Sequence, residues 1–224
     1  SQVLLVNNAN ITGGTLTSAG GGQIRTGNGQ TVVVNNVTVS GGSTWNLGDN
    51  TFNNATGTIT NNGSIVGGAV NAASDLRLIG GNLTLAGSGS VTLQNANDRI
   101  YDDNGGRILT NSDGHTIQGF GQIGTGGAMR FINEGLVDAN VSGQTLRLNV
   151  AGSGGTVNNA TLRASNGGTL QIERLVNNAN GLILAQGSGS QVLLVNNANI
   201  TGGTLTNTGG GQIRTGNGQT VAVS

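Results

Sequence analysis

The residues best suited to chemistry lie together near the middle of the chain. Four of the nine acidic residues fall within 16 positions, and the single histidine follows them: Asp98, Asp102, Asp103, Asp113 and His115. Carboxylates grouped in this way could bind Ca²⁺, which takes several oxygen ligands, or could assist the cleavage of an acidic polysaccharide. They could equally lie on a solvated loop and pair with the nearby Arg99 and Arg107.

The residue types give little further support to either kind of chemistry. A glycosidase needs two carboxylates at a defined separation, which spacing along a sequence does not fix. A lyase would also need a cationic cleft, and the chain contains no lysine. We therefore predict a non-enzymatic protein with no catalytic, cofactor-binding or metal site, and keep the four aspartates as candidate calcium ligands.

Several other patterns do not indicate a site. The glycine-rich stretch Gly20–Gln30 lacks the GxxxxGK[ST] spacing of a phosphate loop, and the calcium-binding nonapeptide GGxGxDx is absent. Thr-x-Thr triplets begin at Thr15, Thr58 and Thr204, too irregularly for an ice-binding face. Isolated aromatic residues could stack on sugars, but we expect them to fill the interior or seal a loop: Trp45, Phe52, Tyr101, Phe120 and Phe131.

The distribution of charged and apolar residues argues against two classes of partner, nucleic acids and membranes. Nine arginines are scattered singly and nine acids balance them, whereas nucleic-acid binding needs concentrated positive charge. No segment approaches the roughly 20 apolar residues of a membrane-spanning helix, so we expect no direct membrane insertion. A weakly charged surface rich in Asn, Thr and Ser suits neutral partners, such as glycans or further copies of the chain.

The elements that must position these residues are β-strands. Glycine accounts for 43 of 224 residues, proline and cysteine are absent, and aromatics make up 2%. Disorder goes with low hydrophobicity and high net charge, and collagen needs abundant proline, so neither fits. Runs such as Leu76-Arg77-Leu78 alternate apolar and polar residues, which is typical of strands with one buried face. Glycine pairs between the runs supply the turns.

A long internal repeat organises the chain. Residues 1–17 return unchanged as 190–206, and Gly20–Val32 returns as Gly209–Val221, which gives a unit of 189 residues. Four positions differ across the 35-residue overlap: Ser18/Asn207, Ala19/Thr208, Val33/Ala222 and Asn35/Ser224. We expect residues 1–189 to form one unit and 190–224 to begin the next without a linker, as an excerpt from a longer array.

Shorter periods within the unit predict a β-solenoid. The Asn-Asn pairs at Asn158, Asn177 and Asn196 are 19 residues apart, and those at Asn7 and Asn35 are 28 apart. One coil of a parallel β-helix takes a similar length, its asparagines can stack into amide ladders, and its crossovers are right-handed. We predict a right-handed parallel β-helix that adds about 40 Å per unit at about 4.8 Å per coil. The alternative is a string of β-sandwiches, which usually keep aromatic anchors and proline-containing loops.

Phrases throughout the chain resemble the coils of filamentous-haemagglutinin-like adhesins and the related autotransporter passengers. Examples are residues 59–68 (ITNNGSIVGG), 115–127 (HTIQGFGQIGTGG), 131–149 (FINEGLVDANVSGQTLRLN) and 175–190 (LVNNANGLILAQGSGS). The resemblance implies a right-handed β-helix, secretion, and a role as an adhesin or fibre at the bacterial cell surface, in cell adhesion or biofilms. The partners we expect are other copies end to end, or surface glycans and matrix polysaccharide. A carbohydrate-active or glycan-binding β-helix module is the alternative.

Overall fold

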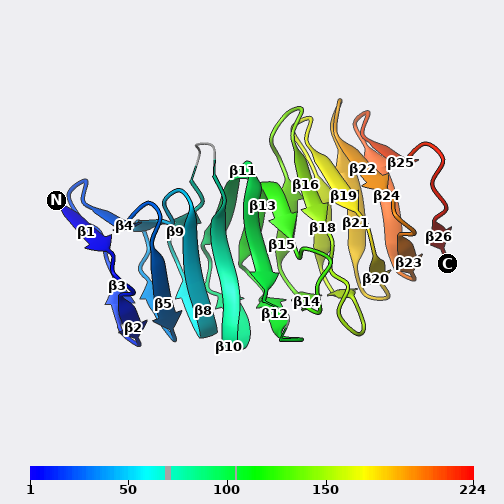
Figure 1. The fold of residues 1–224 in the computed structure, drawn as a ribbon. Coiled ribbons are helices and arrows are strands. Elements are labelled where there is room, and N and C mark those ends of the chain that lie inside the picture. The colour runs from blue at the N-terminus through cyan, green and yellow to red at the C-terminus, as the bar shows by residue number, and fades with distance from the viewer. Residues whose placement is uncertain (69–71, 104) are drawn as a thin grey trace.

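The computed structural model describes residues 1–68, 72–103 and 105–224. The described part of the chain forms 26 β-strands and no helix, and the paired strands are parallel. Figure 1 shows these strands stacked side by side along one axis, with the two termini at opposite ends of an elongated molecule. The prediction of an all-β parallel solenoid is therefore confirmed. No helix that could cross a membrane is found among the described residues.

Each coil of the solenoid contributes one strand segment to each of three faces, which we call the first, second and third face. Along the first face lie β1 (Gln2–Leu5), β4 (Gln23–Thr26), β7 (Thr44–Asn46), β9 (Ser64–Val66), the start of β11 (Ser90–Asp102), the start of β13 (Thr116–Ile123), β15 (Leu136–Ala139), β18 (Thr161–Ala164), β21 (Leu182–Gln186) and β24 (Thr204–Thr208).

Along the second face lie β2 (Asn10–Thr12), β5 (Thr31–Asn35), the start of β8 (Thr51–Asn61), the start of β10 (Ser74–Ala86), the ends of β11 and β13, β16 (Thr145–Leu148), β19 (Thr169–Ile172), β22 (Gln191–Leu194) and β25 (Gln212–Thr215).

Along the third face lie β3 (Thr15–Leu16), β6 (Thr38–Val39), the ends of β8 and β10, β12 (Ile108–Asn111), β14 (Arg130–Asn133), β17 (Thr156–Asn158), β20 (Leu175–Asn177), β23 (Asn199–Thr201) and β26 (Ala222–Val223).

The coils vary in length because their corners differ. Paired residues on the first face are between 20 and 26 positions apart, as in Thr44 with Ser64 and Ser64 with Ser90, within the predicted range. The strands themselves stay in register, so the extra residues are accommodated at the corners between faces. Asn7 and Asn8 form one such corner with φ angles of 54° and 58°, a left-handed conformation that asparagine tolerates better than most residues.

Alternation along each strand builds a continuous apolar interior. On the second face Leu76, Ile100, Ile123 and Leu148 occupy one inward column, and each is at most 1% exposed. Burying a side chain of this size contributes roughly 1.5–3 kcal/mol, and each one contacts the coils before and after it. The core is therefore one continuous cluster, arranged as columns along the axis of the solenoid.

The aromatic residues divide between the interior and the surface. Trp45 and Phe131 are 0% exposed, as expected, and the Trp45 indole donates a hydrogen bond of 3.2 Å to the Thr26 hydroxyl. Phe52 is 37% exposed and Tyr101 is half-buried, both on the outside of the second face. Phe120 is half-buried at an outward position of β13. We expected the aromatic residues to fill the interior or seal a loop, and Phe52, Tyr101 and Phe120 do not fill the interior because they occupy outward positions of their strands.

Candidate functional site

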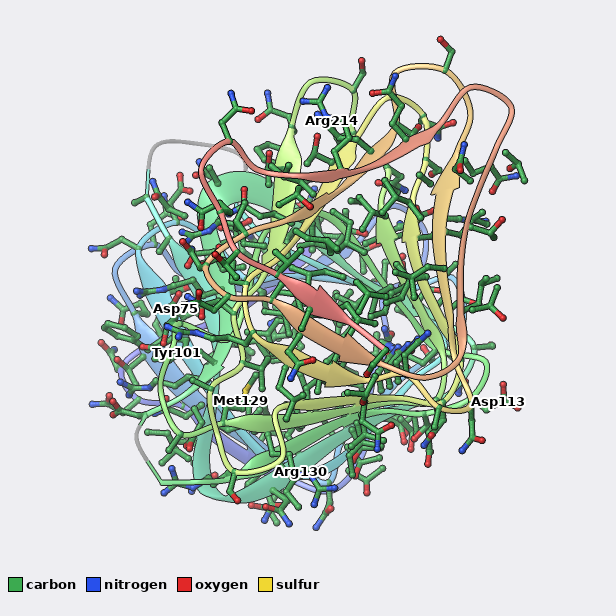
Figure 2. All side chains as sticks on the ribbon, turned by 90° about the vertical axis from the view of Figure 1, so that its right-hand side faces the viewer. Asp75, Tyr101, Asp113, Met129, Arg130 and Arg214 are labelled. Carbon is green, nitrogen blue, oxygen red and sulfur yellow. The ribbon has the colours of Figure 1, made fainter. Side chains whose placement is uncertain are left out.

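The structure disperses the four candidate aspartates and His115 instead of gathering them into a cleft. Asp98, Asp102 and His115 are buried, at 0%, 3% and 0% exposure. Asp103 and Asp113 are exposed. Figure 2 looks along the solenoid and places Asp113 on the opposite side of the cross-section from Asp75 and Tyr101. In the described part of the chain no three His, Asp or Glu side chains are grouped where they could hold a metal ion.

Asp98 ties together neighbouring coils at a corner of the solenoid. Its carboxylate accepts hydrogen bonds from the backbone N–H groups of Ser74 at 2.9 Å, Gln94 at 2.9 Å and Asn95 at 3.1 Å. Burial raises the pKa of Asp98 to about 6, although these backbone hydrogen bonds act to lower it. A carboxylate whose oxygens are committed to three amides is a structural group rather than a free acid or base.

Two of the other candidate aspartates, Asp102 and Asp103, are paired with arginines. The Arg107 guanidinium contacts Asp102 with Nη1 at 2.5 Å from Oδ1, and the Arg107 backbone N–H donates to Oδ2 at 3.0 Å. Asp103 lies 3.5 Å from Nη1 of Arg77, on the preceding coil. Pairing with nearby arginines is one of the alternatives that the sequence leaves open, and Asp102 does pair with the predicted Arg107. Asp103 pairs with an arginine that sequence distance did not suggest.

His115 belongs to a buried hydrogen-bonded row of side chains at one corner, which we call the amide ladder. Its members are Asn61, His115, Asn111, Asn133, Asn158 and Asn178. From Asn111 onward each amide nitrogen donates to the next amide oxygen at 2.7–2.8 Å. The predicted stacking of asparagines is confirmed here for Asn158 and Asn178, which belong to Asn-Asn pairs. The row also includes Asn111 and Asn133, which do not.

The ladder fixes the state of the histidine. Since the Asn111 Oδ1 atom can only accept, Nδ1 of His115 must carry the proton of their 2.7 Å hydrogen bond. Nε2 is then free to accept from the Asn61 amide nitrogen at 3.2 Å. Burial lowers the pKa of His115 to about 4, so the ring is neutral at pH 7. This histidine continues an amide row and does not face solvent as a metal ligand or base would.

The second face carries a group of charged and aromatic side chains that the sequence did not single out as a site. We call it the exterior cluster; it comprises Phe52, Asp75, Arg77, Arg99 and Tyr101. Asp75 and Arg99 are ladder partners on adjacent coils, and the guanidinium binds both carboxylate oxygens, at 2.8 Å and 2.5 Å. Arg77 stacks on Phe52 at 4.5 Å and Arg99 on Tyr101 at 4.8 Å.

Both arginines of the exterior cluster have nearby partners. The hydrogen bond to Asp75 raises the pKa of Arg99, and burial raises the pKa of Tyr101. Arg77 donates to the Asn54 side chain at 2.9 Å and stacks on Phe52, while Arg99 binds Asp75, which is only 1% exposed, and stacks on Tyr101. The arrangement braces three successive coils from outside. It also combines cationic, acidic and aromatic side chains on one outer surface.

A shallow polar groove of about 610 Å³ runs along the first face. Its carboxylate, Asp138, is held by Arg163 at 2.6 Å and by the Ser165 hydroxyl at 2.9 Å. Asn140 donates to Gln118 across the same groove at 3.2 Å. These side chains satisfy one another between coils, so the groove does not present an uncommitted acid and base to a substrate.

The junction between the repeated segments is part of the same ladder. We call residues 1–35 the first copy and residues 190–224 the second copy. In the second copy β22, β23 and β24 pair with β19, β20 and β21 of the preceding coil, and Gln191 N–H donates to the Gly168 carbonyl at 3.0 Å. The hydrogen-bonding and the core both continue across residue 189.

The chain matches no family model, no curated protein and no solved structure.

Proposed function

We propose that the chain is a non-enzymatic structural repeat segment of an extracellular bacterial surface adhesin or fibre, acting as a stiff spacer. The observation that carries this proposal is the unbroken pairing of the second copy with the preceding coil. A joint made of ladder hydrogen bonds and shared core has no flexible linker, so units in series extend one rod. Each coil contacts only its neighbours, and stability then grows with repeat number.

The distribution of polar groups supports a mechanical role. Buried polar side chains bind neighbouring coils, as Asp98 and the amide ladder do. Ion pairs also join neighbouring coils, as between Arg147 and the buried Glu173 at 2.6 Å. These contacts resist bending and sliding of one coil on the next. End-to-end association with other copies is a second use of the same open coil edges.

The carbohydrate-active alternative has less support. It calls for carboxylates and a cation gathered in a cleft. Asp98, Asp102 and Asp103 are instead engaged with backbone amides or arginines, and Asp113 is exposed on another side of the cross-section. A glycan-binding module would have to use the exterior cluster, where Phe52 is 37% exposed. Titration of the chain with neutral and acidic polysaccharides, with a Phe52→Ala variant as the control, tests that role directly.

Electron microscopy of an extended chain tests the spacer function. In such a chain residues 36–224 are repeated several times after Ser224, and the axial length added per 189-residue unit is measured. At about 4.8 Å per turn, we expect about 40 Å per unit in a smooth, narrow rod. Beads joined by flexible segments would contradict the proposal, since the units would then be separate domains.

A further inference from the structure

The 189-residue unit does not correspond to a whole number of turns. Within the described residues, eight hydrogen-bonded steps along the first face lead from β1 to β21. The copy of β1 is β22, which comes next in the chain after β21 and lies on the second face, paired with β19. One unit therefore spans eight turns and one further face, or 8⅓ turns.

The same displacement holds for all five strands of the overlap. β1, β2 and β3 lie on the first, second and third faces, whereas their copies β22, β23 and β24 lie on the second, third and first. β4 and β5 are on the first and second faces, and their copies β25 and β26 are on the second and third. A shift shared by every strand belongs to the repeat as a whole and is not a local slip.

The same Asn-Asn segment forms the corner between the first and second faces in the first copy and the corner between the second and third faces in the second copy. Asn7 and Asn8 have φ angles of 54° and 58°, and their copies Asn196 and Asn197 have 53° and 62°. Each corner is closed in the same way: the N–H of Asn7 donates to the Gln30 side chain at 2.9 Å, and that of Asn196 to the side chain of the copied glutamine at 2.8 Å. The corners are thus specified by the segment itself, and the face it occupies is specified by the number of coils before it.

We propose that successive units join with this displacement of one face, so that a second copy of the unit is the partner of the coil edge formed by β19, β20 and β21, within residues 169–189. Side chains on the first face of one unit then lie on the second face of the next and on the third face of the one after. The pattern returns after three units, which together make 25 turns. The exterior cluster therefore appears in all three face columns of a rod in turn.

This inference rests on the proposed spacer function, because it needs units in series, and it adds how the spacer presents its surface. A unit of whole turns would confine each side-chain pattern to one column. The displacement instead distributes the ionic and aromatic side chains among the three columns, so a partner can reach the same cluster on different faces. Copying the gene segment extends the rod and changes the face that displays the cluster in one step.

Disulfide mapping in the full 224-residue chain tests the displacement. The chain contains no cysteine, so pairs introduced at outward positions report on single contacts. Ladder partners on adjacent coils lie about 4.8 Å apart, within the Cα separation that a disulfide spans. Gln171→Cys with Leu193→Cys tests the second face, and Leu184→Cys with Thr206→Cys tests the first. Leu184→Cys with Leu193→Cys is the matched control.

The two ladder pairs should crosslink at least tenfold faster than the control pair under mild oxidation. Crosslinking of residues 184 and 193 as fast as the ladder pairs would overturn the displacement, because β21 and β22 would then not lie on different faces. Failure of both ladder pairs would overturn it as well. A beaded extended chain with the expected crosslinks would remove the spacer function and leave the displacement intact. A smooth rod in which the control pair crosslinks as fast as the ladder pairs would support the spacer function and overturn the displacement.

Discussion

The two copies of the repeated segment have almost the same sequence and opposite environments. Of their 35 positions, 31 are identical, yet Val3 is 54% exposed while its counterpart Val192 is 0% exposed. The relation is reversed one coil later, where Ile24 is 1% exposed and its counterpart Ile213 is only half-buried. Burial in this fold is therefore determined by which neighbouring coil is present, and not by the residue alone.

The copies complement each other because each lacks a different neighbour. The first copy has a coil after it, and the second copy has a coil before it. Taken together they display both sets of contacts that an internal copy would make. None of the four differing positions is buried in either copy, so the contacts that build the core are the part of the segment kept unchanged.

Truncating equivalent core residues in the two copies should give the largest contrast. Ile24→Ala and Ile200→Ala each remove a side chain at most 1% exposed and should lower the free energy of unfolding by about 2–4 kcal/mol. Their counterparts Ile213→Ala and Ile11→Ala remove partly buried side chains and should cost about 1 kcal/mol or less. Urea unfolding followed by circular dichroism measures all four, and equal costs within each pair would contradict the dependence on neighbours.

The fold could be predicted from local sequence patterns, because these patterns do not depend on the exact length of each coil. Alternation in Leu76-Arg77-Leu78 indicated one buried face, and the short repeats indicated stacking; both were right. The same alternation could also have placed Asp98 and Asp102 inside, because both share the inward side of their strand with Ile100. Their charge suggested a solvated loop instead.

Contacts between coils could not be predicted in the same way. The pairing of Asp75 with Arg99 depends on a separation of 24 residues between these two coils, whereas coil lengths along the chain run from 20 to 26. An uncertainty of one residue moves a side chain to the other side of the strand. The displacement of one face was hidden for the same reason, since it requires every coil to be counted.

Buried charges extend the comparison from apolar groups to ionisable ones. Folded Asp98 holds its proton more tightly than the unfolded chain does, with a pKa of about 6 against 3.8, so its contribution to stability falls as pH rises through that interval. His115 is the opposite case: its pKa of about 4 in place of 6.5 means that its contribution is lost as pH falls. Between pH 4 and 6 the two nearly cancel.

Removing one group should therefore reveal the other. His115→Asn keeps a hydrogen-bonding side chain in the amide ladder. As pH rises from 4 to 6, its free energy of unfolding should fall by up to about 3 kcal/mol relative to wild type, because only the contribution of Asp98 is left. Asp98→Asn should show the reverse trend over the same interval. Urea midpoints at pH 4, 5, 6 and 7 measure both, and differences from wild type remove the contribution of Glu173. A His115→Asn profile parallel to wild type would contradict the assignment.

The amide ladder provides a direct test of how the second copy is attached. Asn178 donates to the carbonyls of Gly202 and Thr204 in that copy at 3.3 Å and 3.4 Å, and it accepts from Asn158 at 2.7 Å. Asn178→Ala removes all three hydrogen bonds, including the buried one from Asn158, and should cost about 1–3 kcal/mol. It should also increase amide hydrogen exchange in residues 190–224 before the rest of the chain.

The neighbouring asparagine is the matched control. Asn177 is exposed and its side chain accepts only a local hydrogen bond from the Ala179 N–H at 3.2 Å. Asn177→Ala should change stability by about 0.5 kcal/mol or less and leave exchange in the second copy unaltered. If both variants loosened the second copy equally, the ladder would not be what attaches it.

The smallest effects are expected where the copies differ. Exchanging Ser18, Ala19, Val33 and Asn35 for the residues of the second copy alters outward or exposed positions only, and each change should shift the free energy of unfolding by about 0.5 kcal/mol or less. Val33→Ala should be the largest, because Val33 lies within β5 between Asn10 and Asn54 and valine favours strands. Urea unfolding of the fourfold variant measures the sum. A loss several times larger would mean that the first copy is adapted to its own face, and that the segment cannot be moved from one face to the next as a one-face displacement requires.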